Sequence, residues 1–170
     1  MTKIKEVAKY LIFAYEKQTG SQFENSELKL QKLMYLIQRE SLCLTGDVMF
    51  DDEFEGWKHG PVIPELRFYF ENDYEFLNSI EGSNLSEQEM YIINNVIAQY
   101  GMYESWYLAN LTHEESSWLN SRRGLEPNEH GRNHLSVEDI RNDSKKIRQY
   151  DYVFDMYIDE FEDAEDDNYA

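Results

Sequence analysis

The chain has 170 residues, with 34 acidic and 16 basic side chains and a formal net charge of −18. This length is typical of a single domain, and a hydrophobic content of 41 %, including 13 Tyr and 9 Phe, can form a core without a metal or a disulfide. The negative charge disfavours ordinary nucleic-acid binding, which needs many cations against the phosphates, and it favours a partner with a basic surface.

The first 20 residues interleave lysines with apolar side chains, whereas a signal peptide has a charged block followed by an unbroken apolar stretch. The longest apolar runs are far shorter than the roughly 20 residues that span a membrane. Cys43 is the single cysteine, so no disulfide can form within the chain, and we interpret it as a small buried hydrophobic residue. We expect a cytoplasmic protein without membrane contacts.

Helical periodicity predicts the first two elements. Apolar side chains over residues 4–15 recur at helical spacing, and this helix is expected to end near Gly20. A second helix is predicted to begin after Asn25 or Ser26, either of which can cap it, and to end at Gly46.

The helical period fails over residues 47–60, where aromatic side chains alternate with turn-forming residues. This pattern predicts a small β-hairpin or extended segment. A third helix is expected from about Pro64 to Leu77, because proline suits the first turn of a helix.

Two helix starts are marked by the S/T-x-x-E spacing of a capping box. Ser86 with Glu89 opens the first of these helices, which Gly101 is expected to end in a left-handed conformation. Thr112 with Glu115 is predicted to cap a second helix.

A long final helix is predicted to begin at Ser136 and to reach Phe161 in the acidic tail, because apolar residues recur every seven positions. Residues 151–170 hold nine acidic side chains and no basic ones, and the last nine residues lack any apolar period. We therefore predict a mainly α, compact single-domain bundle of about six to seven helices over residues 1–150. An acidic C-terminal extension over residues 151–170 is expected to be partly helical and then disordered.

The chain has four histidines, a residue type that can bind metals or act as a general acid or base. His130 and His134 have i, i+4 spacing, but they lie in a loop with glycine and proline, so a zinc site is not expected. His113 beside acidic residues is interpreted as part of a helix start rather than an acid–base pair. We expect no catalytic residue, no metal and no cofactor.

Three segments carry a family resemblance: the run from Lys29 to Leu33, Trp57 followed by Gly60-Pro61-Val62, and Leu111 to Glu114 followed by Trp118. With these segments in this order, the chain from Lys3 to about Ile140 resembles the SocA-like antitoxin (Panacea) domain, also described as phage-associated proteins of the GepA type. The resemblance implies a non-enzymatic antitoxin of a phage or mobile element that neutralises a partner toxin by direct protein binding.

The residues that carry the resemblance are expected to specify either the fold or a partner surface. They are Lys29, Gln31, Lys32, Trp57, Gly60, Pro61, Val62, Thr112, His113, Glu114 and Trp118. We expect Gly60-Pro61 to form a rigid turn and Trp118 to lie in the core. Lys29 and Lys32 are interpreted as exposed cations, one turn apart, that either hold an acidic partner or extend over the core.

The acidic extension offers a second candidate for partner binding. Phe154, Tyr157, Ile158 and Phe161 are predicted to form an apolar stripe, framed by carboxylates, that docks in a basic groove of the toxin. The alternative is that this stripe packs on the protein's own core. Two other functions stay open: an acidic nucleic-acid mimic that inhibits a host DNA-binding enzyme, and a proteolytic adaptor that passes a bound toxin to a protease.

Overall fold

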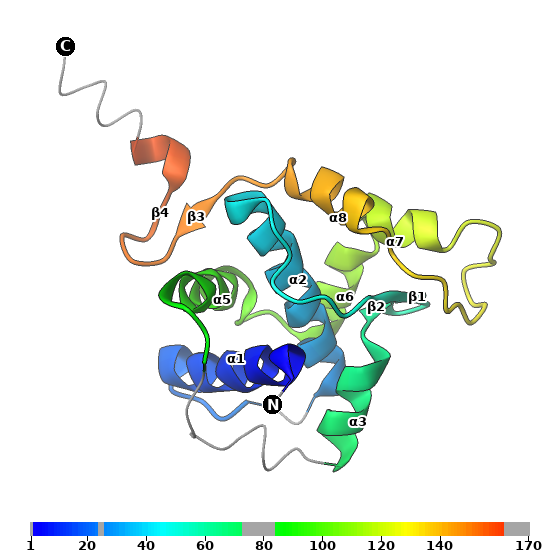
Figure 1. The fold of residues 1–170 in the computed structure, drawn as a ribbon, viewed down its shortest axis with the longest axis horizontal. Coiled ribbons are helices and arrows are strands. Elements are labelled where there is room, and N and C mark those ends of the chain that lie inside the picture. Colours follow the sequence, from blue (N-terminus) through cyan, green and yellow to red (C-terminus); the bar gives the residue numbers. More distant parts are fainter. Residues whose placement is uncertain (1, 24–25, 73–83, 162–170) are drawn as a thin grey trace.

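The computed structural model describes residues 2–23, 26–72 and 84–161. It is a compact, mainly α structure, as predicted, with two small antiparallel strand pairs, of which only the first was predicted (Figure 1). Its helices are α1 (Lys3–Thr19), α2 (Glu27–Thr45), α3 (Pro64–Asn72), α5 (Glu87–Tyr100), α6 (Ser105–Thr112), α7 (Ser116–Ser121) and α8 (Val137–Ser144). The strands are β1 (Glu55–Trp57), β2 (Gly60–Val62), β3 (Tyr150–Asp151) and β4 (Met156–Tyr157).

Helix α2 lies at the centre of the molecule (Figure 1). Helices α5, α6 and α8 pack against it, and α1 packs mainly against α5. Every residue of α2 from Lys29 to Leu42 is buried, because neighbouring elements cover the helix on all sides. Polar side chains on α2 therefore need partners inside the protein.

Most of the predicted helix ends are confirmed. Ser26 accepts a hydrogen bond from the third backbone N–H of α2, and Ser86 forms the complete capping box of α5. Gly20 and Gly46 end their helices in the left-handed conformation. Gly101 ends α5 as predicted, but the predicted left-handed conformation was wrong: its φ is −62°, and the chain continues through a right-handed turn towards α6.

The predicted β-hairpin is present as β1 and β2, with Glu55 opposite Val62 and Trp57 opposite Gly60. The prediction of a Gly60-Pro61 turn was wrong, because these residues begin β2 and the turn lies at residues 58–59. Gly60 nevertheless has a backbone φ of 113°, a conformation that other residues rarely adopt.

Thr112 does not cap α7 as predicted. It is the last residue of α6, and its hydroxyl donates to the carbonyl of Ala109 at 2.7 Å. The cap of α7 comes from α8, where Asp143 accepts the backbone N–H groups of Ser116 at 3.1 Å and Ser117 at 2.9 Å. Burial opposes ionisation of Asp143, but these serine hydrogen bonds outweigh it and hold the pKa of its carboxyl below the ordinary value.

The prediction of a long final helix to Phe161 was also wrong. Helix α8 ends at Ser144, and the chain then forms the antiparallel pair β3–β4. Contacts to α5 compete with helix formation: Asp151 accepts a hydrogen bond from the Tyr91 hydroxyl, and Asn95 accepts the N–H of Tyr152 at 2.8 Å. The predicted end of the third helix at Leu77 and the last nine residues of the tail lie outside the described residues.

Candidate functional site

Buried side chains of α2 hold the β1–β2 hairpin. The Gln31 amide donates to the carbonyl of Ile63 at 3.1 Å and accepts the N–H of the same residue at 2.9 Å. The ammonium of Lys32 donates to the carbonyl of Pro61 at 2.8 Å. These bonds satisfy backbone groups at the end of β2, so Gln31 and Lys32 fix the hairpin against the central helix.

The predicted exposure of Lys29 and Lys32 was wrong. Their exposed fractions are 6 % and 0 %, because each ammonium turns inwards to a partner. Lys29 lies 4.7 Å from the centre of the Tyr15 ring, in a cation–π contact. Burial lowers the pKa of Lys32 to about 7, and Glu27 only partly opposes this shift.

Gly60 permits a close approach between the hairpin and α6. A Cβ atom at this position would lie 2.6 Å from the hydroxyl of Thr112 and 2.7 Å from Cε of Lys32. Thr112 is fully buried. Three residues of the family resemblance, Lys32, Gly60 and Thr112, are therefore in close contact, and they determine how the hairpin packs against α2 and α6.

The two tryptophans of the resemblance are joined by a hydrogen bond between α7 and the β1–β2 hairpin. Trp118 on α7 donates its indole N–H to the backbone carbonyl of Trp57 at 2.7 Å. The imidazole of His113 stacks on the Trp118 ring with 4.4 Å between centres. Burial lowers the pKa of His113, and the charge of Lys32 adds to the shift. Trp118 is buried as expected, whereas Glu114 is exposed and takes no part in this packing.

Arg122 completes the support of the hairpin, and the sequence analysis did not identify it. Its guanidinium donates to the carbonyls of Gly56 at 2.8 Å and Glu129 at 2.5 Å, and it lies 5.5 Å from the centre of the Trp118 ring. Because Arg122 lies in a loop rich in charged and turn-forming residues, no local pattern marks it as buried.

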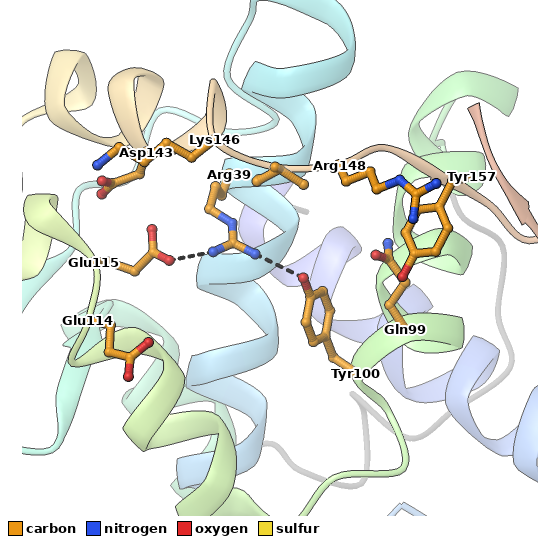
Figure 2. Close-up of a pocket in the computed structure, with 10 residues that line it drawn as sticks. Arg39, Gln99, Tyr100, Glu114, Glu115, Asp143, Lys146, Arg148 and Tyr157 are labelled. Carbon is orange, nitrogen blue, oxygen red and sulfur yellow. Dashed lines mark hydrogen bonds and ion pairs between the residues drawn. The ribbon is translucent and has the colours of Figure 1, made fainter. Parts of the chain in front are cut away.

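A second buried polar cluster surrounds Arg39 in the C-terminal half of α2 (Figure 2). The Arg39 guanidinium donates to the carboxylate of Glu115 at 2.5 Å and to the hydroxyl of Tyr100 at 3.0 Å. The hydroxyls of Tyr35 and Ser117 share a hydrogen bond at 2.8 Å. These contacts join α2 to α5 and to the start of α7, and the sequence analysis missed all of them.

The Arg39 cluster lines a cavity of about 360 Å³. Three cations, Arg39, Lys146 and Arg148, and three carboxylates, those of Glu114, Glu115 and Asp143, line it. Arg39 points to Glu115, whereas Arg148 lies on the other side, against Tyr157 (Figure 2). Burial raises the pKa of Glu115, while the Arg39 guanidinium opposes that shift. Arg39 and Glu115 form an ion pair in the wall of the cavity, and with charges of both signs in similar number the lining does not favour one charged ligand.

Glu40 and Cys43 lie next to this cluster on α2. Glu40 is 2 % exposed, and burial raises the pKa of its carboxyl to about 7. Cys43 is half-buried, less than expected, and its sulfur lies 3.3 Å from the amide nitrogen of Gln149. Burial also raises the pKa of the Cys43 thiol, which makes it a poor nucleophile.

The four candidates in the C-terminal extension do not form a helical stripe. Phe154 lies in the turn between β3 and β4 and is 70 % exposed, and the ring of Phe161 packs against it with 5.6 Å between centres. Tyr157 instead packs on Tyr150, and Arg148 lies 3.9 Å from the centre of the Tyr157 ring. Ile158 is half-buried.

Phe154 and Phe161 therefore form an apolar patch at the end of the hairpin, and Val153 precedes Phe154 in the same turn; we call these three residues the tail surface. Val153 is 60 % exposed. Carboxylates of Asp155, Asp159 and Glu160 belong to the same short segment, and the Asp159 and Glu160 side chains pair with Arg148 at 2.8 and 3.4 Å.

The described residues contain no group of three or more histidine, cysteine or acidic side chains that could hold a metal ion. His130 and His134, for which the sequence predicted no zinc site, have different partners: His130 packs against Trp57, and His134 pairs with Glu53 at 2.7 Å. No helix in the described part of the chain is long and apolar enough to cross a membrane.

A comparison with models of protein families matches residues 30–119 to the antitoxin SocA-like, Panacea domain. The matched segment runs from α2 to α7, and it contains the β1–β2 hairpin with most of the residues that hold it. No curated protein and no solved structure matches the chain.

Proposed function

Because the chain belongs to the SocA-like antitoxin family with the Panacea domain, we propose that it is a non-enzymatic antitoxin that neutralises a toxin by direct binding. The observation that carries this proposal is the family match over residues 30–119, which includes the packed centre of the fold. Membership of an antitoxin family implies a toxin partner. A phage or mobile-element origin and a cytoplasmic location belong to the same proposal.

We propose that the tail surface is the toxin contact. Phe154 supplies a large apolar side chain that the protein leaves in solvent, and such side chains at the centre of an interface contribute much of its binding energy. Residues 151–170 hold nine acidic side chains and no basic ones, and this net negative charge complements a basic groove and increases the rate of association with it. This negative charge supports a toxin with a basic surface as the partner.

The experiment is growth of a bacterial host that expresses the reading frame next to this gene, with and without this protein, followed by co-purification of the pair. The proposal predicts that the neighbouring product arrests growth, and that this protein binds it and restores growth. A harmless neighbour that does not co-purify contradicts the proposal.

Two further outcomes separate the alternative functions. If DNA competes with this protein for a bound enzyme, the protein acts as an acidic nucleic-acid mimic, for which the net charge of −18 is the supporting observation. If growth is restored only while a host protease is present and the bound toxin disappears, the protein acts as a proteolytic adaptor. Neutralisation by binding alone predicts an intact toxin in a stable complex.

A further inference from the structure

A pocket of about 280 Å³ opens beside the β1–β2 hairpin, away from the tail surface. From its chemistry we propose that this pocket binds a carboxylate carried on a small apolar body, either a free organic acid or the C-terminal residue of a polypeptide. The proposal goes beyond the antitoxin function and does not depend on it.

The walls of the pocket are largely apolar. The Trp57 indole, Leu28 from the start of α2 and Val62 from β2 line it, and the edge of the His130 ring contacts Trp57 with 5.2 Å between centres. The volume is slightly below the range of about 300 to 1,000 Å³ that is usual for sites of small molecules. A body of the size of one large amino-acid side chain suits this space.

The charged groups that line the pocket are mostly cations. Lys32, Lys58 and Arg67 line it, against a single lining carboxylate, that of Glu27. Glu27 is already paired, because Nε of Arg67 lies 2.8 Å from its Oε1 atom. The ammonium of Lys32 is fully buried and bound to the carbonyl of Pro61, so Lys58 and Arg67 are the cations that can reach a ligand, and they favour an anion in a chain with 34 acidic and 16 basic residues.

Two features leave these cations able to meet a ligand. The Lys58 side chain is exposed. The Arg67 guanidinium lies over the Trp57 ring at 5.1 Å; its Nε pairs with Glu27 and its Nη2 with Glu71 at 3.2 Å, which leaves Nη1 as its donor for a ligand beside the apolar face. The pKa of the His59 imidazole, which also lines the pocket, is lowered first by burial and then by the charges of Lys58 and Lys32.

The test is a titration with 3-phenylpropionate, followed by NMR through the indole N–H signal of Trp57, which the variant Trp57→Phe assigns. The uncharged 3-phenylpropionamide is the matched control ligand. We expect saturable binding with a Kd of about 0.1 to 1 mM, and binding of the amide weaker by about tenfold or more. No shift at about 10 mM of the acid, or equal binding of acid and amide, overturns the proposal.

The cations are tested with a double variant, Lys58→Gln with Arg67→Gln, and with Arg148→Gln as the control at the other end of the molecule. We expect the double variant to bind 3-phenylpropionate at least about tenfold more weakly, while Arg148→Gln binds it like the wild type. Both altered side chains reach solvent, so the fold is expected to persist, and the amide NMR spectrum checks this. Unchanged binding by the double variant contradicts the proposal.

A peptide with a C-terminal phenylalanine, with a free or an amidated carboxyl group, separates the two sources of the ligand. Tighter binding of the free peptide than of 3-phenylpropionate identifies a polypeptide C-terminus as the ligand. Binding of the organic acid alone identifies a small molecule. Either result supports the carboxylate site, whereas equal binding of the free and amidated peptides, with no binding of the acid, contradicts it.

Discussion

The two β-hairpins lie towards opposite ends of α2 and are held in opposite ways (Figure 1). Buried polar side chains, among them Gln31, Lys32 and Arg122, bind the backbone of β1–β2. The β3–β4 hairpin is held by contacts to α5, and its charged pair Arg148–Asp159 is more than half exposed. One hairpin is therefore built into the core, and the other is attached to its surface.

This difference separates the residues that specify the fold from those available to a partner. The family match covers β1–β2 and ends before β3–β4. Most of the residues that carry the family resemblance are buried in the packing of the fold, whereas the apolar side chains of the tail surface are exposed to solvent. The first hairpin therefore belongs to the packed fold, and we propose the second as the toxin contact.

The largest effect is expected for Gly60→Ala in β1–β2. The new methyl group would overlap Thr112 and Lys32 at a backbone φ of 113°, so we expect a loss of about 2 to 4 kcal/mol in the free energy of unfolding. The measurement is urea denaturation. Gly46→Ala is the matched control, because Gly46 also has positive φ but has no atom within 4 Å of the new Cβ, and its expected cost is about 1 kcal/mol. Equal losses would show that Gly60 does not act through packing.

A smaller effect, with a defined pH dependence, is expected for Glu40→Gln. The folded protein raises the pKa of this carboxyl from 4.5 to about 7, so the folded state binds more protons than the unfolded state between these values. The contribution of Glu40 to stability therefore falls as pH rises from about 4.5 to 7. The variant should be more stable than the wild type at pH 8, on the order of 1 to 3 kcal/mol, and the gain should shrink towards pH 4.5.

Urea denaturation at pH 4.5, 6 and 8 measures this difference, with the surface variant Glu104→Gln as the control. A gain in the free energy of unfolding for Glu40→Gln that is independent of pH would contradict the assigned ionisation.

Lys32, at the other end of α2, has the opposite pH dependence. Burial lowers its pKa to about 7, so its contribution to the free energy of unfolding rises as pH increases above 7 towards the pKa of an unfolded lysine.

The smallest effect on stability is expected for Phe154→Ser on the tail surface. Because the side chain is 70 % exposed, the free energy of unfolding should change by less than about 0.5 kcal/mol. Thermal unfolding of the isolated protein measures this. A loss of 2 kcal/mol or more would mean that the patch packs on the protein's own core, which was the alternative interpretation of the sequence.

The elements that were predicted correctly depend on interactions within a few residues of the chain. The caps at Ser26 and Ser86 and the left-handed ends at Gly20 and Gly46 involve only the adjacent helical turn. The same reasoning failed at Thr112, because the cap of α7 is supplied by Asp143, which lies 27 residues from Ser116.

The buried polar residues were not predictable from local pattern. Lysine is usually exposed, so burial of Lys32 follows only from the acceptor at Pro61, 29 residues away. The repeat of apolar residues from Ile140 to Phe161 predicted a helix, but tertiary hydrogen bonds from α5 to Asp151 and Tyr152 favour a hairpin. The periodicity identified the apolar residues correctly, but hydrogen bonds with residues of α5 determine the backbone structure that they adopt.

The most direct test is calorimetric titration of the purified product of the neighbouring reading frame with three forms of this protein: wild type, Phe154→Ser and Gly46→Ala. We predict that Phe154→Ser binds at least about tenfold more weakly than wild type while it unfolds at the same temperature, and that Gly46→Ala, although less stable, binds with unchanged affinity. Equal affinities for all three forms would show that the toxin does not dock on the tail surface, and no binding by any form would contradict the antitoxin function.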